Sequence, residues 1–360
     1  MIGKEHDEDS ALRVNEGIEP PSSVNPEAAT RFKKIRPHSL EADDYKKGII
    51  KGERAILSKA ITLVESSLPK HQELAQQIIN ACVPHSGNSI RVGITGVPGV
   101  GKSTFIEALG RYLTAQGNRI AVLAIDPSSR RTKGSILGDK TRMEDLANDP
   151  MAFIRPSSSS GTLGGVARNT RETIILCEAA GYNVIFVETV GVGQSETAVH
   201  SMVDFFLLLM LAGAGDELQG IKRGIMEMAD AIVINKADGD NIKKAELAAR
   251  EYKNALHLFP LSPSGWAPRV LTASSVEGGG ISEIWQMIME YREAALRNEY
   301  FGQRRKEQAL QAFTDTVEEA IRQRFYHNPN TARSLNALQQ EILAGQISPY
   351  AAARKLLEGE

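Results

Sequence analysis

Eight residues between an apolar run and a helical stretch constrain this chain more than any other feature. They read GVPGVGKS and match the pattern GxxxxGK[ST], directly after the predicted strand 90–95 and before a helix that we expect to begin near Thr104. The glycines let successive backbone NH groups turn inward around phosphate oxygens, and the helix N-terminus adds its positive end. The pattern therefore predicts a phosphate-binding loop formed by Gly96, Val97, Pro98, Gly99, Val100, Gly101, Lys102, Ser103 and Thr104.

Two side chains of this loop have predicted roles with a nucleotide. Lys102 is expected to reach the β- and γ-phosphates, and the hydroxyl of Ser103 is expected to bind Mg²⁺. A chance glycine-rich turn is the alternative, and the strand and helix on either side argue against it.

Apolar runs around this loop predict the fold class. Short runs rich in β-branched residues alternate with helical stretches from residue 89 onward, and the runs are almost continuously apolar. Strands of that kind belong in a parallel sheet that is covered by helices on both faces. We therefore expect an α/β domain with a doubly wound, mostly parallel sheet over residues 89–295, with strands at 90–95, 120–125, 153–154, 184–187, 205–211, 231–234 and 270–272.

The segments outside this domain have different patterns. Residues 1–42 mix charges and prolines without apolar periodicity, which predicts a disordered tail. Residues 43–88 have helical periodicity, with Pro69 separating two expected helices. Residues 296–360 form a C-terminal helical extension in which Pro329 ends a long helix and Ser348 caps the last one. The pattern alone leaves packing within one chain and dimerisation equally open.

Composition limits the class of partner. Lys and Arg total 42 against 44 Asp and Glu, a net charge of −2, so binding dominated by nucleic-acid phosphates is disfavoured. The longest apolar run, 205–214, is about half of the roughly 20 residues that span a bilayer. The acidic first twenty residues resemble neither a signal nor a transit peptide, so we expect a cytoplasmic protein with no membrane partner. Cys82 and Cys177 are expected to be buried rather than reactive.

A second motif predicts which base is bound. Asn235, Lys236, Ala237 and Asp238 follow the expected strand 231–234. The carboxylate of Asp238 can accept hydrogen bonds from N1 and the exocyclic N2 of guanine, whereas adenine offers neither donor and would leave a desolvated carboxylate unpaired. Together with the phosphate loop, this motif favours GTP over ATP.

Three acids are candidates for the metal and for hydrolysis. Asp126 and Glu188 end the expected strands 120–125 and 184–187, where carboxylates beside a phosphate loop hold Mg²⁺ or orient water. Helix capping is the alternative for both. Asp139 lies in a polar loop, and from its position alone it is better explained as a solvated acid. The segments 126–143 and 189–194 are interpreted as switch segments that order around a γ-phosphate.

Seven blocks of sequence together resemble one family. They are GITGVPGVGKSTFIEALG at 93–110, AVLAIDPSS at 121–129, GSILGDKTRM at 134–143, FIRPSSSSGTLGGVAR at 153–168, VETVGVGQSE at 187–196, GAGDELQGIKRGI at 213–225 and NKADG at 235–239. With these blocks the chain resembles the bacterial ArgK/MeaB-type GTPases, whose human relative is the methylmalonic aciduria type A protein. The resemblance covers about residues 45–300 and implies a G-protein chaperone of an adenosylcobalamin-dependent acyl-CoA mutase, with methylmalonyl-CoA mutase as the first candidate.

The resemblance also implies roles for particular residues. It assigns Asp126, Asp139 and Glu188 to Mg²⁺ and the switches, and it implicates Gln219 and Lys222 in transmitting the nucleotide state to the mutase and in activated hydrolysis of GTP to GDP and phosphate. Gln194 is the candidate by analogy for positioning the hydrolytic water. The family uses its C-terminal extension to form homodimers, which favours a homodimer here.

The chain departs from the usual pattern where many GTPases show a Ser-Ala pair over the guanine. It reads Thr272, Ala273 and Ser274, and we expect the backbone NH of Ala273 to bind the base oxygen.

Three other functions stay open from the sequence. A nickel-enzyme metallochaperone GTPase shares the loop but needs a Cys/His cluster, and the cysteines and histidines here show no ligand spacing. An ATP-dependent kinase of a transport-associated binding protein would use ATP, against which Asp238 argues. The third is a module that binds nucleotide without catalysis.

Overall fold

The computed structural model describes residues 40–125, 143–156, 163–189, 195–213, 223–260 and 262–358. These residues form a seven-stranded sheet in the order β3-β2-β4-β1-β5-β6-β7, and every neighbouring pair of strands is parallel. The strands are β1 (Ile90–Gly96), β2 (Ile120–Ile125), β3 (Ala152–Arg155), β4 (Val184–Thr189), β5 (Phe205–Leu211), β6 (Ala231–Asn235) and β7 (Arg269–Thr272). The predicted fold class is confirmed.

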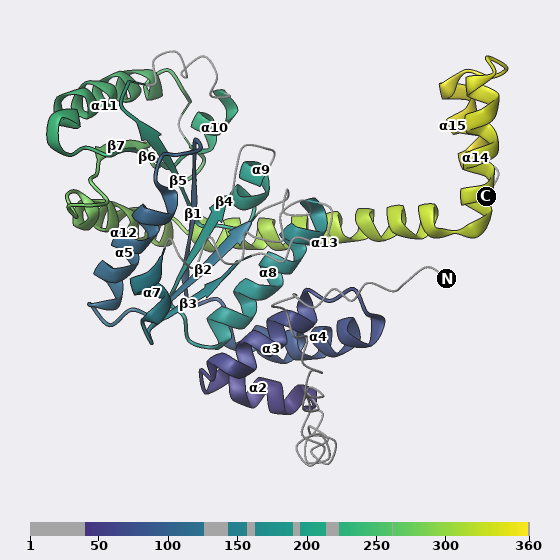
Figure 1. The fold of residues 1–360 in the computed structure, drawn as a ribbon, viewed down its shortest axis with the longest axis horizontal. Helices are drawn as coiled ribbons and strands as arrows, with labels where there is room; N and C mark the ends of the chain where they lie inside the picture. Colours follow the sequence, from purple (N-terminus) through teal and green to yellow (C-terminus); the bar gives the residue numbers. More distant parts are fainter. Residues whose placement is uncertain are drawn as a thin grey trace, which may run out of the picture. The chain divides into compact units, whose positions relative to one another are not determined.

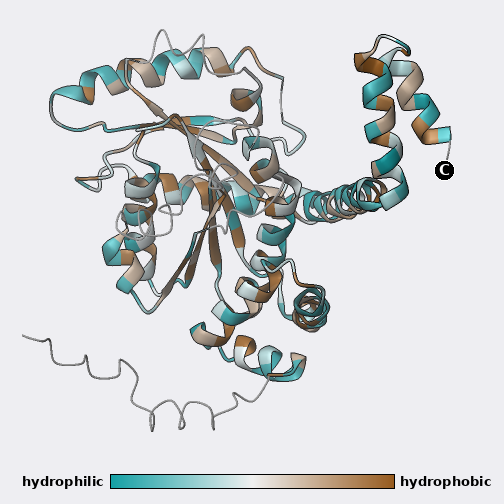
Figure 2. Cartoon of the chain, turned by 45° about the vertical axis from the view of Figure 1, so that its right-hand side comes forward, coloured by the Kyte–Doolittle hydropathy of each residue, from teal (hydrophilic) through white to brown (hydrophobic). Residues whose placement is uncertain are grey.

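Helices cover both faces of the sheet (Figure 1). On one face, the core joins alternate residues of the strands to α5 (Lys102–Thr114), α7 (Glu144–Asn148) and α12 (Ile281–Arg297). The other face is covered by α8 (Leu163–Ala179), α9 (Ser195–His200), α10 (Arg223–Met228) and α11 (Ile242–Leu256). Because helices cover both faces, the strands in the middle of the sheet are buried and mostly apolar, as the hydropathy colouring shows (Figure 2), whereas the edge strand β7 is partly exposed.

Three helices precede β1 in the described part of the chain, where the sequence predicted two. They are α2 (Ala42–Ile50), α3 (Arg54–Val64) and α4 (Pro69–Cys82), followed by a short 3₁₀ turn η1 (Val83–His85), and all three helices pack on α8. The extra break lies at Gly52, whose φ of 76° only glycine adopts without strain. Residues 1–39, most of the predicted tail, lie outside the described residues.

The C-terminal helices are α13 (Tyr300–His327), α14 (Pro329–Leu343) and α15 (Pro349–Glu358). The break between α12 and α13 falls at Glu299, which has a φ of 61°. The prediction that Ser348 caps the last helix is confirmed, since its Oγ accepts from the NH of Ala351 at 3.2 Å. Figure 1 shows α13 carrying α14 and α15 away from the sheet.

Burial fits the remaining expectations. Cys82 and Cys177 are both buried, as the sequence predicted, and burial raises the pKa of each thiol. None of the helices in the described ranges combines the length and apolar character that crossing a bilayer requires.

Candidate functional site

The phosphate loop lies between the end of β1 and the start of α5. Gly96 has no room for a side chain, because a Cβ there would overlap the carbonyl oxygen of Leu209 on the neighbouring strand β5. Gly101 precedes α5 with a φ of 91°, a left-handed conformation that favours glycine. The helix begins at Lys102, two residues earlier than expected, so its positive end meets the loop directly.

The Lys102 side chain folds back against the loop. Its Nζ donates to the carbonyl oxygens of Gly96 at 2.9 Å and Val97 at 3.4 Å. Burial lowers the pKa of Lys102, while the carboxylates of Glu188 and then Glu196 act in the opposite direction. The ammonium group of Lys102 is therefore held inside the predicted phosphate loop, where phosphates would bind.

An acid at the end of β4 meets the serine at the start of α5. Glu188 is 3% exposed, and its Oε1 accepts from the hydroxyl of Ser103 at 3.2 Å. The register of the sheet explains this contact, because Glu188 lies beside Ile94, just before the loop. A hydroxyl and a carboxylate at this distance are a donor set that fits a hard, oxygen-preferring cation such as Mg²⁺.

The base-recognition motif lies further along the same edge of the sheet. Asn235 is the last residue of β6. Asp238 lies at the end of the same motif, immediately before η3 (Gly239–Asn241). The hydroxyl of Ser274, in the loop after β7, donates to Oδ2 of Asp238 at 2.8 Å. Ser274 is buried, and Thr272, which pairs with Ile234, ends β7. The fold therefore brings the predicted residues of the base-recognition motif together with the predicted residues Thr272 and Ser274 at the end of β7.

The expected role of Ala273 is wrong. Its NH donates to the carbonyl oxygen of Ile234 at 2.9 Å, and its own carbonyl accepts from the NH of Ala237 at 2.9 Å. The pairing of β6 with β7 thus continues one residue past the strand, and this NH is already used. A base oxygen has to find its donor elsewhere in the loop.

Two residues near the site were not singled out from the sequence. The hydroxyl of Ser275 donates to Oδ1 of Asn235 at 2.7 Å. Glu196, in the first turn of α9, is 7% exposed and contributes to the electrostatic environment of Lys102. The only sequence signals were a second serine next to Ser274 and an acid two residues after Gln194.

Several predicted residues cannot be placed. Asp126, Asp139, Gln194, Gln219 and Lys222 lie outside the described residues. Within the described ranges, no group of three or more His, Cys, Asp or Glu side chains is arranged to hold a metal ion.

The strand order explains why the phosphate loop, Glu188 and Asn235 lie at the same end of the sheet. From β1 the chain crosses towards β2 and β3 on one side, whereas β5, β6 and β7 follow on the other side. In open parallel sheets, ligands bind at the carboxyl ends of the strands where the direction of winding changes. The phosphate loop, Glu188 and Asn235 all lie at carboxyl ends of these strands.

The chain is similar to known proteins that are described as GTPases. Residues 57–330 match the family model described as methylmalonyl-CoA mutase-associated GTPase MeaB. A probable GTPase of Mycobacterium bovis is 54% identical over 307 residues, which cover 85% of this chain and 91% of that protein. The GTPase ArgK of Escherichia coli is 49% identical over 307 residues, with 85% and 93% covered.

A mouse protein and a solved structure are also similar. The mitochondrial methylmalonic aciduria type A homolog of Mus musculus is 46% identical over 321 residues, which cover 86% of this chain and 77% of that protein. The crystal structure of a LAO/AO transport system kinase has a TM-score of 0.73 and 40% identity, and the match covers 89% of this chain and 98% of that one.

Proposed function

The chain belongs to the MeaB family of methylmalonyl-CoA mutase-associated GTPases, and from this premise we propose that it gates cofactor loading of an adenosylcobalamin-dependent acyl-CoA mutase and protects that enzyme. Methylmalonyl-CoA mutase is the proposed partner, because the family description names it. One observation carries the nucleotide part of the proposal: Lys102 with Ser103 and Asp238 with Ser274 lie along the carboxyl edge of one parallel sheet.

In the proposed complex GTP lies along this edge. The backbone NH groups of the phosphate loop and the ammonium group of Lys102 bind the phosphates. The carboxylate of Asp238, oriented by the Ser274 hydroxyl, accepts from N1 and N2 of guanine. The phosphates act on Lys102 in the same sense as Glu188 and Glu196, so binding favours its charged form.

Hydrolysis requires attack by water on the γ-phosphorus. The bond from this phosphorus to the β–γ bridging oxygen breaks, and GDP and inorganic phosphate leave. Lys102 stabilises the negative charge that moves towards the leaving oxygen. A bound Mg²⁺ would supply further charge stabilisation, and Ser103 and Glu188 are the described residues that would hold it. Asp126, Asp139 and Gln194 stay proposed for the metal and the water on the family pattern.

Coupling to a partner requires that the two nucleotide states bind it differently, because equal affinity shifts no equilibrium. Glu188 and Glu196 lie on either side of residues 189–194, the second proposed switch, so a change in this segment acts on the phosphate end of the site. Gln219 and Lys222 are proposed to transmit this change to the mutase.

We further propose a homodimer formed through the C-terminal helices. Leu310, Phe313, Val317 and Ile321 recur every three or four residues along α13 and are 69%, 67%, 39% and 63% exposed. An apolar stripe at this spacing lies along one side of a helix. A second copy of the chain would cover it.

The decisive experiment measures GTP turnover with and without purified methylmalonyl-CoA mutase. We expect stimulation of roughly tenfold or more, loss of turnover in Lys102→Ala, and different mutase affinities in the GTP-analogue and GDP states. Equal affinities together with unstimulated turnover would rule out the chaperone role. ATP binding as tight as GTP binding in calorimetry would remove the proposed base recognition as well.

A further inference from the structure

Ser275 connects the base end of the proposed site to its phosphate end. Its hydroxyl donates to Oδ1 of Asn235 at 2.7 Å, and Nδ2 of the same amide donates to the carbonyl oxygen of Val100 at 2.8 Å. Val100 belongs to the phosphate loop, whereas Ser275 belongs to the loop after β7. One amide therefore joins two loops that are about 175 residues apart in the sequence.

Asn235 has little freedom in this arrangement. It is 1% exposed, so each polar atom of its amide needs a partner within the protein. Its Nδ2 also lies against Gly101, where an added Cβ would come within 3.0 Å of it. The amide is thus held by Ser275 on one side and packed under the phosphate loop on the other.

The neighbouring serine has a different task. Ser274 closes the loop on itself, because its NH donates to Gly279, its carbonyl accepts from Gly278 and its hydroxyl accepts from the NH of Glu277. The same hydroxyl donates to Asp238. Ser274 therefore shapes the loop and orients the carboxylate that reads the base, while Ser275 reaches back to β6 and the phosphate loop.

We propose that Ser275 is a positioning residue that sets how long guanine nucleotides stay bound. The inference rests on the proposed position of GTP, with its phosphates at the loop and its base at Asp238. Without the hydroxyl, Oδ1 of Asn235 is a buried acceptor with no donor, and the amide turns away from Val100. The base loop and the phosphate loop then open independently, and the nucleotide leaves when either one opens.

The test uses the full-length chain and the release of a fluorescent GDP analogue followed by stopped flow. Ser275→Ala is expected to release GDP roughly tenfold faster, which corresponds to about 1.4 kcal/mol and to the net value of one hydrogen bond. Ser275→Thr keeps a hydroxyl and is expected to restore the rate to within about twofold of the original.

The matched control is Ser89→Ala. Ser89 is also buried, and its hydroxyl donates to Glu178 at 2.6 Å. It lies directly before β1, however, at the amino ends of the strands and not at the carboxyl ends where the proposed site lies. This control is expected to release GDP at the original rate. Melting temperatures of all variants show whether a change in release reflects general destabilisation.

A second nucleotide separates the two serines. Inosine diphosphate lacks the exocyclic amine, one of the two groups that Asp238 accepts from. Ser275→Ala is expected to accelerate release of both diphosphates by the same factor, whereas Ser274→Ala is expected to accelerate GDP release more than IDP release.

The outcomes distinguish this inference from the function on which it rests. If the unaltered chain binds no GDP, the proposed nucleotide site fails. If it binds GDP, three results each overturn the role of Ser275: unchanged release from Ser275→Ala, no restoration by Ser275→Thr, or equal acceleration by Ser89→Ala.

Discussion

At the scale of single residues, three charged groups of the described part of the site are each held by a hydrogen bond. Ser103 of α5 donates to Glu188 of β4, Ser274 donates to Asp238, and Lys102 donates to the carbonyl oxygen of Gly96. Held groups of this kind lose little freedom when a ligand binds. Lys102, Glu188 and Asp238 are therefore already held in place in the chain without a ligand.

We expect Glu188→Gln to raise the Mg²⁺ concentration needed for half-maximal GTP turnover by about tenfold to a hundredfold. The amide still accepts the Ser103 hydrogen bond but lacks the negative charge that a divalent cation prefers. The measurement is a Mg²⁺ titration of turnover. Glu277→Gln, which removes an exposed carboxylate from the loop after β7, is the control. An unchanged Mg²⁺ requirement in Glu188→Gln would remove Glu188 from the metal site.

Asp230, directly before β6, is a buried acid that the proposed reaction does not use. Its Oδ2 accepts from the NH of Phe206 at 2.8 Å, and burial raises its pKa to about 6, opposed mainly by Arg304. Between the ordinary value near 3.8 and this value, the folded chain binds more protons than the unfolded chain. The contribution of Asp230 to stability is therefore greatest at low pH and falls as the pH rises through this window.

We expect Asp230→Asn to become more stable relative to the original chain between pH 4 and pH 7. Asparagine can still accept from Phe206 but has no charge to desolvate, and the relative gain should be on the order of 2 kcal/mol. The gain is smaller than burial alone implies, because Arg304 loses a charge partner. Urea denaturation at several pH values measures the difference. A difference that does not change with pH would contradict the raised pKa.

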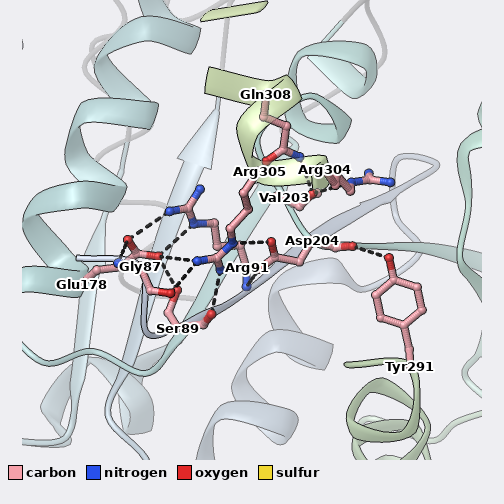
Figure 3. A network of polar contacts seen from close by, with 10 residues as sticks. All are labelled: Gly87, Ser89, Arg91, Glu178, Val203, Asp204, Tyr291, Arg304, Arg305 and Gln308. Atoms are coloured by element: carbon pink, nitrogen blue, oxygen red, sulfur yellow. Dashed lines mark hydrogen bonds and ion pairs between the residues drawn. The ribbon is translucent and has the colours of Figure 1, made fainter. Parts of the chain in front are cut away.

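At the scale of elements, a polar network anchors the first turns of α13 to the amino edge of the sheet (Figure 3). Arg305 donates to both carboxylate oxygens of Asp204, at 2.8 and 2.7 Å, and to the carbonyl oxygens of Gly87 and Ser89. Arg304 and Gln308 both donate to the carbonyl oxygen of Val203. The residues of α13 beyond this anchor are mostly exposed, so this network, together with Tyr300 and Phe301 packed against the core and an ion pair between Asp315 and Arg171, attaches α13 to the rest of the chain.

We expect Arg305→Ala to lower the free energy of unfolding by about 3 to 5 kcal/mol, because it leaves the buried carboxylate of Asp204 without its cation. Arg305→Lys should recover only part of this loss, since one ammonium group cannot match the geometry of the guanidinium. The control is Arg354→Ala, which breaks an exposed ion pair with Glu358 and should cost less than about 0.5 kcal/mol. Denaturant titration compares them, and equal losses would contradict a structural role for the network.

At the scale of the whole molecule, the described residues after residue 41 form one compact unit by internal contacts, yet α13 contributes no buried residue to it. After its first turn, the large apolar side chains of this 28-residue helix are exposed, so that part of the helix gains little from packing within its own chain. Among the described residues, α13 therefore carries a row of exposed apolar side chains at helical spacing. This is the basis of the proposed homodimer.

We expect Phe313→Asp to shift the chain towards monomers, because a carboxylate in the middle of the stripe would be desolvated on association. Sedimentation velocity over a range of concentrations measures the shift. Leu258→Asp is the control, because Leu258 is 82% exposed at the end of α11, away from the stripe. Association that survives Phe313→Asp, or that Leu258→Asp disrupts equally, would contradict the proposed interface.

The sequence predicted the sheet well where the strands are completely buried. The bounds of β2 and β5 agree with the expected 120–125 and 205–211, because both strands are continuous runs of apolar residues that are almost completely buried. It missed the break at Gly52. The residues on both sides of Gly52 have helical periodicity, and a single left-handed residue leaves almost no trace in that pattern.

Spacing and residue type by themselves predicted the doubly wound sheet, and they led to the proposals of a phosphate loop after the first strand and of Asp238 as the residue that reads the base. These features depend on local chemistry and on burial along each strand. Only the tertiary structure decided which backbone NH groups remain available for a ligand. Ala273 was a reasonable candidate until the pairing of β6 with β7 was seen to use its NH, while Ser275 gained a role from Asn235 and Val100, which are distant in sequence. Hydrogen bonds between distant segments depend on strand register and side-chain direction, and a single sequence records neither.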